Sequence, residues 1–346
     1  MKLQKKTFAS PKGEIVQYTI TNDKGTEVVL SNLGAGIVAI KLPEADGSKT
    51  DVVLGYDDPE AYFADGPCAG KTPGRYANRI AKGHIEVDGK EYSLPINNGP
   101  NHLHGGPEGY QNRLWKAEEI SDNSVRFSLH SPDGDCNYPG AVDATVTYTW
   151  SNDNALKIEY SAKTDAPTYI NLTNHTYFNL DGHSSGTVLN HLLKMNCSTY
   201  LPTDETQIPL GAPAPVAGTP MDFTKETAIG AHIKDDFEAL KIGKGYDHCY
   251  MVDGYDSTVK EVATLSSPRK GGHKLTVYSN QPAAQVYTGN WLAGCPEGKG
   301  GYTYSDYDAV AIECQGAPDA PNNDKLPSQR LNPGEEYKKV IVFELK

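Results

Sequence analysis

Cysteine is scarce in this sequence, and its spacing excludes several kinds of site. The chain has 346 residues and six cysteines, and no two of them form a Cys-X-X-Cys pair. The missing pairs argue against a zinc ribbon and against a thioredoxin-type redox site. Six cysteines are also too few for a disulfide scaffold of this length, so we expect free thiols in a reducing compartment.

Long apolar runs and basic clusters are missing too. No stretch approaches the roughly 20 apolar residues of a membrane-spanning helix. Lys2, Lys5 and Lys6 give the chain a basic start, but the apolar core of a signal peptide does not follow. The 44 acidic and 32 basic side chains give a formal net charge of −12 without a basic patch. We therefore expect a cytoplasmic protein that binds neither nucleic acid nor a membrane.

Helical periodicity is confined to two short segments. Asp58-Pro59 is typical of a helix start and predicts a short helix running to about Phe63. A second segment gives one candidate set of amphipathic helical turns from the spacing of its apolar residues, Ile229, Ile233, Phe237 and Leu240. The 34 glycines and 23 prolines are spread along the chain without a linker, so we expect a single domain over residues 1–346.

Strand patterns dominate the rest of the sequence. Short runs rich in Val, Ile, Thr and Tyr predict strands at Ser124–His130, Ala144–Trp150, Ala155–Ala162, Lys274–Ser279, Ala283–Gly289, Ala309–Gln315 and Lys338–Leu345. Asp88-Gly89 between two further runs predicts a tight β-hairpin. The sequence therefore predicts an all-β fold, a large and mostly antiparallel β-sandwich.

Glu313 is the sharpest clue to a site that the residues alone provide. Alternation in the run AVAIECQ puts Glu313 on one face with Ala309 and Ala311, while apolar residues occupy the other face. The strand is thus expected to be buried on both sides. A carboxylate in such a strand is costly unless it is paired or used, so a structural ion pair and a catalytic role both stay open.

Histidines stand in two polar motifs. His102 and His104 in NHLHGG would share one face of a strand, and a metal pair or a structural role is open for them, although no third ligand lies at a clear spacing. The two glycines that follow favour close approach of a ligand. His175 in TNHTYFNL is flanked by small hydrogen-bonding side chains, which favours a functional role. For Asp247 in GYDHC, a loop cap is the favoured interpretation from the residues alone.

The segment GPCAGKT at residues 66–72 invites comparison with a phosphate-binding loop. That loop requires a glycine where Asp65 stands, so we reject a nucleotide site.

Six motifs occur together in the order of a known family. They are GRYANRIAKG at 74–83, NHLHGG at 101–106, TNHTYFNL at 173–180, GYDH at 245–248, AAQVYTGN at 283–290 and IECQ at 312–315. Together they resemble the galactose mutarotases, or aldose 1-epimerases, from about residue 10 to the end of the chain. One of these motifs alone would be weak evidence, whereas six in order are specific. The family's large antiparallel β-sandwich agrees with the fold predicted above.

The resemblance implies roles for individual residues. Glu313 falls on the family's catalytic base and His175 on its catalytic acid. Sugar-contacting positions of the family fall on Asn78, Arg79, His104, Asp247 and Gln285, and Tyr177 beside the acid is expected to line the cleft. Relatives that act on hexose 6-phosphates would require further basic residues, which Arg79 alone does not indicate.

Mutarotation fits these residue types. The pyranose ring must open, the C1–C2 bond must rotate, and the ring must close on the other carbonyl face. Opening requires a base at the C1 hydroxyl and an acid at the ring oxygen, and a buried Glu and a His can both exchange protons near neutral pH. We therefore expect an isomerase that acts on D-galactose or D-glucose and needs no metal and no cofactor.

Three alternatives stay open. A glycosidase would use two carboxylates roughly 5–9 Å apart, such as Glu313 and Asp247, and would release an aglycone. A non-catalytic sugar-binding module would keep an aromatic cleft, which the 21 tyrosines suit, and could lose the acid and the base. A metal enzyme built on His102 and His104 would lose activity in the presence of a chelator. The preferred sugar and the oligomeric state, monomer or homodimer, do not follow from the sequence.

Overall fold

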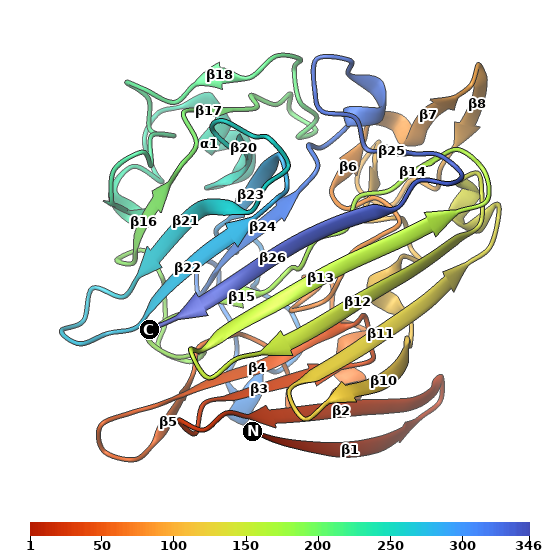
Figure 1. Cartoon of the computed structure of the whole chain (residues 1–346). Coiled ribbons are helices and arrows are strands. Elements are labelled where there is room, and N and C mark those ends of the chain that lie inside the picture. Colours follow the sequence, from red (N-terminus) through yellow and green to blue (C-terminus); the bar gives the residue numbers. More distant parts are fainter.

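The computed structural model describes residues 1–346 and consists almost entirely of antiparallel strands and turns (Figure 1). The largest sheet has nine strands, in the spatial order β10 (Lys116–Ser121), β11 (Ser124–Ser131), β12 (Val142–Trp150), β13 (Ala155–Thr164), β26 (Tyr337–Leu345), β22 (Lys274–Ser279), β21 (Lys260–Ser266), β16 (Leu192–Met195) and β19 (Thr227–Ala228). In β12 every second residue is buried, which is the pattern of a sheet with one face on the core.

A six-stranded sheet packs against this large sheet. Its order is β15 (Tyr177–Phe178), β24 (Val310–Gln315), β23 (Ala283–Tyr287), β20 (Asp247–Met251), β17 (Thr199–Tyr200) and β18 (Ala214–Pro215). Phe178 of β15 meets Phe343 of β26 edge to face, with ring centroids 5.1 Å apart. Every residue of β24 is buried, because one face of the strand meets the core and the other faces a second layer of loops.

The first residues of the chain form a sheet of their own. Its strands are β1 (Lys2–Ser10), β2 (Gly13–Thr21), β3 (Glu27–Ser31), β4 (Gly36–Pro43) and β5 (Lys49–Asp51), and Figure 1 shows this sheet below the large one. A core of 57 buried residues is shared by all three sheets, with Tyr18, Val146 and Val286 as one member from each. The fold is therefore the antiparallel β-sandwich that the sequence predicts.

Short elements complete the chain. The two-stranded pairs are β6 (Arg79–Ile80) with β9 (His102–Leu103), β7 (His84–Val87) with β8 (Lys90–Ser93), and β14 (Thr168–Tyr169) with β25 (Arg330–Leu331). The single α-helix is α1 (Glu238–Gly243), and the 3-10 turns are η1 (Pro59–Phe63), η2 (Ala81–Gly83), η3 (Tyr110–Asn112), η4 (Asp135–Asn137), η5 (Ile229–Ala231), η6 (Lys299–Gly301) and η7 (Ala320–Asn322). None of these helices has the length and apolar character needed to cross a membrane.

The two predicted helices have different outcomes. A helical turn does run from Pro59 to Phe63, with the carboxylate of Asp58 accepting a hydrogen bond from the backbone N–H of Glu60, but it is a 3-10 turn. The candidate set of amphipathic helical turns is found only at its two ends, because residues 229–240 hold η5 and the first residues of α1 with no helix between them. Ile229 and Leu240 pack into the core from η5 and α1, whereas Ile233 and Phe237 pack from the irregular backbone between them, so the helical spacing of the four reflects burial and not one helix.

Candidate active site

The register of the six-stranded sheet gathers polar and aromatic side chains on one face. Tyr177 of β15 pairs with Ala311 of β24, Ala311 with Tyr287 of β23, and Tyr287 with Asp247 of β20. Residues paired directly across antiparallel strands share a face. Glu313 lies two residues beyond Ala311 and therefore points to this same face, away from the main core. A cavity of about 610 Å³ opens over this face.

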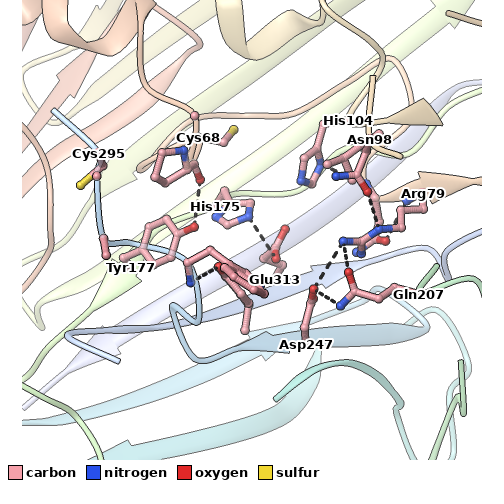
Figure 2. Close-up of a pocket in the computed structure, with 18 of the residues that line it drawn as sticks. Cys68, Arg79, Asn98, His104, His175, Tyr177, Gln207, Asp247, Cys295 and Glu313 are labelled. Atoms are coloured by element: carbon pink, nitrogen blue, oxygen red, sulfur yellow. Dashed lines mark hydrogen bonds and ion pairs between the residues drawn. The ribbon is translucent and has the colours of Figure 1, made fainter. Parts of the chain in front are cut away.

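Glu313 lies on the floor of the cavity, close to His175 (Figure 2). Its side chain is buried, and Oε1 lies 3.4 Å from Nε2 of His175. The second carboxylate oxygen is buried without a hydrogen-bond partner in the protein. Burial, with the negative charge of Asp247 as a second cause, raises the pKa of Glu313 well above its ordinary value. The carboxylate is therefore more basic than a surface Glu and has an oxygen free for a ligand.

His175 is held by the segment that carries GPCAGKT. Its backbone N–H donates to the carbonyl of Lys71 at 2.9 Å, and its carbonyl accepts from the N–H of Gly70 at 2.9 Å. Burial lowers the pKa of His175 to about 4, and Nδ1 has no partner. The imidazole packs against Tyr177, with ring centroids 5.0 Å apart. Burial thus disfavours the charged form of both members of the His175–Glu313 pair.

Asp247 lies toward the other end of the cavity, where its carboxylate is fully engaged. Oδ1 accepts from Nε2 of Gln285 at 2.6 Å, Oδ2 accepts from Nε2 of Gln207 at 2.7 Å, and Nη2 of Arg79 lies 3.5 Å from Oδ2. Burial alone would raise the pKa of Asp247, but the Arg79 guanidinium and the two amides lower it below its ordinary value. Asp247 is therefore the ionised carboxylate of the cavity.

Two further predicted residues lie beside Arg79. The backbone N–H of Asn78 donates to Nδ1 of His104 at 3.1 Å, and burial lowers the pKa of His104 well below its ordinary value. A neutral His104 that accepts at Nδ1 carries its proton on Nε2 and is a hydrogen-bond donor there. Nε of Arg79 donates to Oδ1 of Asn98 at 3.0 Å. This end of the cavity thus presents fixed donors and one carboxylate, which suits the hydroxyl groups of a sugar.

Seven of the eight predicted residues line this cavity: Asn78, Arg79, His104, His175, Tyr177, Asp247 and Glu313. Gln285 does not line it and lies behind Asp247, to which it donates. The hydroxyl of Tyr177 donates to the carbonyl of Pro67 at 2.9 Å, so its ring forms part of the wall. The structure thus places Gln285 as a support for Asp247, one step removed from the cavity.

The expectation that His102 and His104 share a face is wrong. Strand β9 ends at Leu103, and His104 has a positive φ of 51°, so the alternation of a strand stops between them. Nδ1 of His102 lies 2.7 Å from the carbonyl of Pro95 and Nε2 lies 2.7 Å from the hydroxyl of Tyr138. The structure contains no group of three His, Cys, Asp or Glu side chains arranged to hold a metal ion.

Several lining residues were not predicted. Gln207 and Asn98 contact Arg79, while Tyr287, Trp291 and the loops around Cys68 and Cys295 form the walls. Asn98 lies in a turn signalled by Asn97-Asn98-Gly99-Pro100, but a turn signal does not show where the turn points. Gln207 lies in a polar turn with no chemical signature. Their contribution becomes visible only once distant segments are brought together.

A sandwich of antiparallel sheets whose cavity holds a buried pair of His175 and Glu313 has the features of an enzyme that transfers protons on a small hydroxylated substrate. A family model for aldose 1-epimerase matches residues 16–344. The chain is 40% identical to the galactose mutarotase of Homo sapiens over 331 residues, which cover 96% of this chain and 94% of the relative. It is 39% identical to the aldose 1-epimerase of Escherichia coli K12 over 328 residues, or 94% of each chain.

Solved structures agree with these relatives. A galactose 1-epimerase from Lactobacillus acidophilus superposes with a TM-score of 0.86 at 30% identity, covering 100% of this chain and 98% of the other. An aldose epimerase homologue from C. elegans also gives 0.86, at 33% identity over 95% of this chain and 98% of the other. The chain belongs to the aldose 1-epimerase family.

Proposed function

We propose that the protein is an aldose 1-epimerase, an isomerase that interconverts the α- and β-anomers of D-galactose or D-glucose. The observation that carries the proposal is the pair formed by His175 and Glu313, 3.4 Å apart and buried in a cavity whose far end presents Arg79, His104 and the Asp247 carboxylate. Membership of the aldose 1-epimerase family supports it.

Ring opening transfers two protons. The Glu313 carboxylate takes the proton of the C1 hydroxyl while protonated His175 gives a proton to the ring oxygen, and the bond between C1 and that oxygen breaks to leave an aldehyde and a C5 hydroxyl. After rotation about C1–C2, His175 takes the C5 hydroxyl proton as that oxygen attacks C1, and Glu313 returns its proton to the carbonyl oxygen. The two groups end as they began, and no electron is gained or lost.

Burial favours the opening step. Before opening, the pair carries opposite charges, and after opening both members are neutral. A desolvated site disfavours the charged forms of both groups, so Glu313 is a stronger base and protonated His175 a stronger acid than on the surface. Because the two side chains lie in contact, the pair titrates as a unit that holds one proton in its active state.

The polar end of the cavity orients the sugar. Arg79 and the Nε2–H of His104 are donors, and ionised Asp247 is an acceptor, so the ring hydroxyls can be held while C1 and the ring oxygen meet the acid–base pair. Fixing this geometry contributes to the rate, because the reacting atoms no longer have to find each other. Galactose and glucose differ in the configuration of one hydroxyl, and both fit this chemistry.

The alternative of a glycosidase is not favoured by the site. It requires a second carboxylate that serves as acid or nucleophile, and Asp247 is the candidate. Its lowered pKa makes Asp247 a poor proton donor, and because both of its oxygens already accept hydrogen bonds from amides, neither is free to act as a nucleophile.

We place the activity in the cytoplasm, in galactose and hexose metabolism, and the six free cysteines support a reducing compartment.

Polarimetry of freshly dissolved α-D-galactose and α-D-glucose tests the proposal. The protein should speed the approach to the equilibrium rotation without consuming sugar. Decay at the buffer rate for galactose, glucose, xylose and arabinose alike would overturn the assignment.

A further inference from the structure

Gln207 occupies the gap between the two charged groups that face the sugar end of the cavity. Its amide oxygen accepts from Nη2 of Arg79 at 2.5 Å, and its amide nitrogen donates to Oδ2 of Asp247 at 2.7 Å (Figure 2). The side chain lines the cavity together with both partners. None of the six motifs contains this residue.

A structured turn aims the side chain into the cavity. Oδ1 of Asp204 accepts from the backbone N–H groups of Thr206 and Ile208, at 2.8 and 3.1 Å, and the N–H of Gln207 donates to the carbonyl of Asp204 at 2.9 Å. The side-chain amide of Asn101 donates to Oγ1 of Thr206 at 3.0 Å, which ties the turn to the NHLHGG segment. Gln207 itself has a φ of 64°, a left-handed conformation that few non-glycine residues adopt.

The orientation of the amide is fixed by its partners. A guanidinium only donates and a carboxylate only accepts, so the oxygen must face Arg79 and the nitrogen must face Asp247. An amide offers two N–H donors and two acceptor sites, and these contacts use one of each. One N–H and one lone pair remain on a side chain that lines the cavity.

We infer that Gln207 binds a ring hydroxyl of the sugar through this remaining donor and acceptor, and so determines specificity in the epimerase reaction. A hydroxyl both donates and accepts, which matches the pair of sites, whereas a phosphate or a carboxylate would leave the lone pair unsatisfied. The inference rests on the proposed function, because it names a further contact within the same site.

The amide also keeps Arg79 and Asp247 from closing on each other. Their direct contact is 3.5 Å, longer than the roughly 2.7–2.9 Å of a charge-assisted hydrogen bond. With the amide between them, each charged group keeps its direction and part of its hydrogen-bonding capacity for the substrate. Removing the amide would allow a closer ion pair and reduce what is left for the sugar.

Gln207→Leu tests the contact, since leucine keeps much of the volume and removes both polar atoms. Gln207→Asn is the second variant, because asparagine tolerates the left-handed backbone and keeps an amide but is one methylene shorter. Exposed Glu205→Gln, in the same turn, is the matched control. Polarimetry gives kcat and KM for glucose and for its 2-, 3-, 4- and 6-deoxy analogues, and thermal unfolding shows that each variant is folded.

We expect Gln207→Leu to raise KM for glucose about tenfold, with kcat within about threefold of the wild type, and Gln207→Asn to raise KM by a smaller factor. One deoxy analogue should bind the wild type weakly and show a clearly smaller rise in KM on substitution than glucose, because the contacted hydroxyl is absent from it and only the change at Arg79 and Asp247 remains. The substitution and the removal of that hydroxyl would then have non-additive effects on KM. Such non-additivity indicates a direct contact, because a merely structural role of Gln207 would affect all analogues alike.

An equal change in KM for glucose and all four deoxy analogues would overturn the inference, as would unchanged KM values in both variants. A wild-type protein without mutarotase activity would instead overturn the proposed function. The two failures are thus distinguishable.

Discussion

Glu313→Gln separates the chemical role of this residue from its structural one. Glutamine matches glutamate in size and can fill the same place in β24, but it cannot accept the C1 proton. A general base contributes roughly 10²–10⁴-fold to a rate, which corresponds to about 3–5 kcal/mol of transition-state stabilisation. We expect kcat to fall by a factor in this range, while KM changes little because the hydroxyl-binding end of the cavity is untouched.

The same substitution should not destabilise the protein. The pKa of Glu313 is raised in the folded state, so the unfolded chain ionises first as the pH increases. Below the pKa that Glu313 has in the unfolded chain, its ionisation does not lower the free energy of unfolding. As the pH rises from there toward the folded-state pKa, the free energy of unfolding falls progressively. Glutamine has no such cost, so the Tm of Glu313→Gln relative to the wild type should increase between pH 4 and pH 7. Lost activity together with gained stability is typical of a residue kept for function.

Polarimetry and thermal unfolding of three variants make the comparison. Glu118→Gln, at an exposed position of β10, is the control and should match the wild type in both measurements. Asp247→Asn should mainly raise KM, since its proposed role is to hold hydroxyls. A Glu313→Gln protein that retains wild-type kcat would refute the base assignment and make Asp247 the next candidate.

Three more predictions follow from the contacts of the site. The kcat/KM of the wild type should fall below about pH 4, where His175 and Glu313 are both protonated, and again above the raised pKa of Glu313, where the pair has lost its proton. A pH–rate profile measures both decreases, and a profile with only one of them would contradict a mechanism that needs both groups. Lys71→Met should destabilise the fold by about 3–5 kcal/mol in denaturant unfolding, because it leaves the fully buried carboxylate of Asp65 without the ammonium 3.2 Å away; a loss below about 1 kcal/mol would show that this ion pair is not needed. Dialysis against EDTA should leave the rate unchanged, whereas loss of activity with recovery on adding zinc would return His102 and His104 to consideration as ligands.

The predicted strands were recovered where alternation was strong. The runs that became β11, β12, β13 and β26 bury one face against the core, and this periodicity is visible in the sequence. The first sheet was not predicted. Most of β1 is exposed, so its residues carry little hydrophobic pattern, and its place is fixed by pairing with β2. The single domain over residues 1–346 stays a prediction.

Some residues of the candidate site could be predicted from the sequence and others could not. Glu313 could be found because a carboxylate between apolar neighbours conflicts with its own strand, and that conflict is local. Gln207 could not, because its importance comes from Arg79, 128 positions away, and from Asp247, 40 positions away. The contrast between His102 and His104 was hidden as well, since it depends on the backbone turning to a positive φ at His104. Local chemistry can be read from the sequence, whereas contacts between loops require the fold.

The difference between the two carboxylates of the cavity follows from their neighbours. Asp247 and Glu313 share one sheet face, on strands β20 and β24 with β23 between them, yet burial raises the pKa of Glu313 while Arg79 and two amides lower that of Asp247. The negative charge kept on Asp247 is one of the causes that raise the pKa of Glu313. Gln207 and Gln285 therefore favour a raised pKa of Glu313 without touching it, because they help to keep Asp247 ionised, whereas the positive charge of Arg79 acts on Glu313 directly and lowers its pKa. Arg79, Gln207 and Asp247, which we propose to hold the sugar, are thus also linked by charge and hydrogen bonds to the protonation of Glu313.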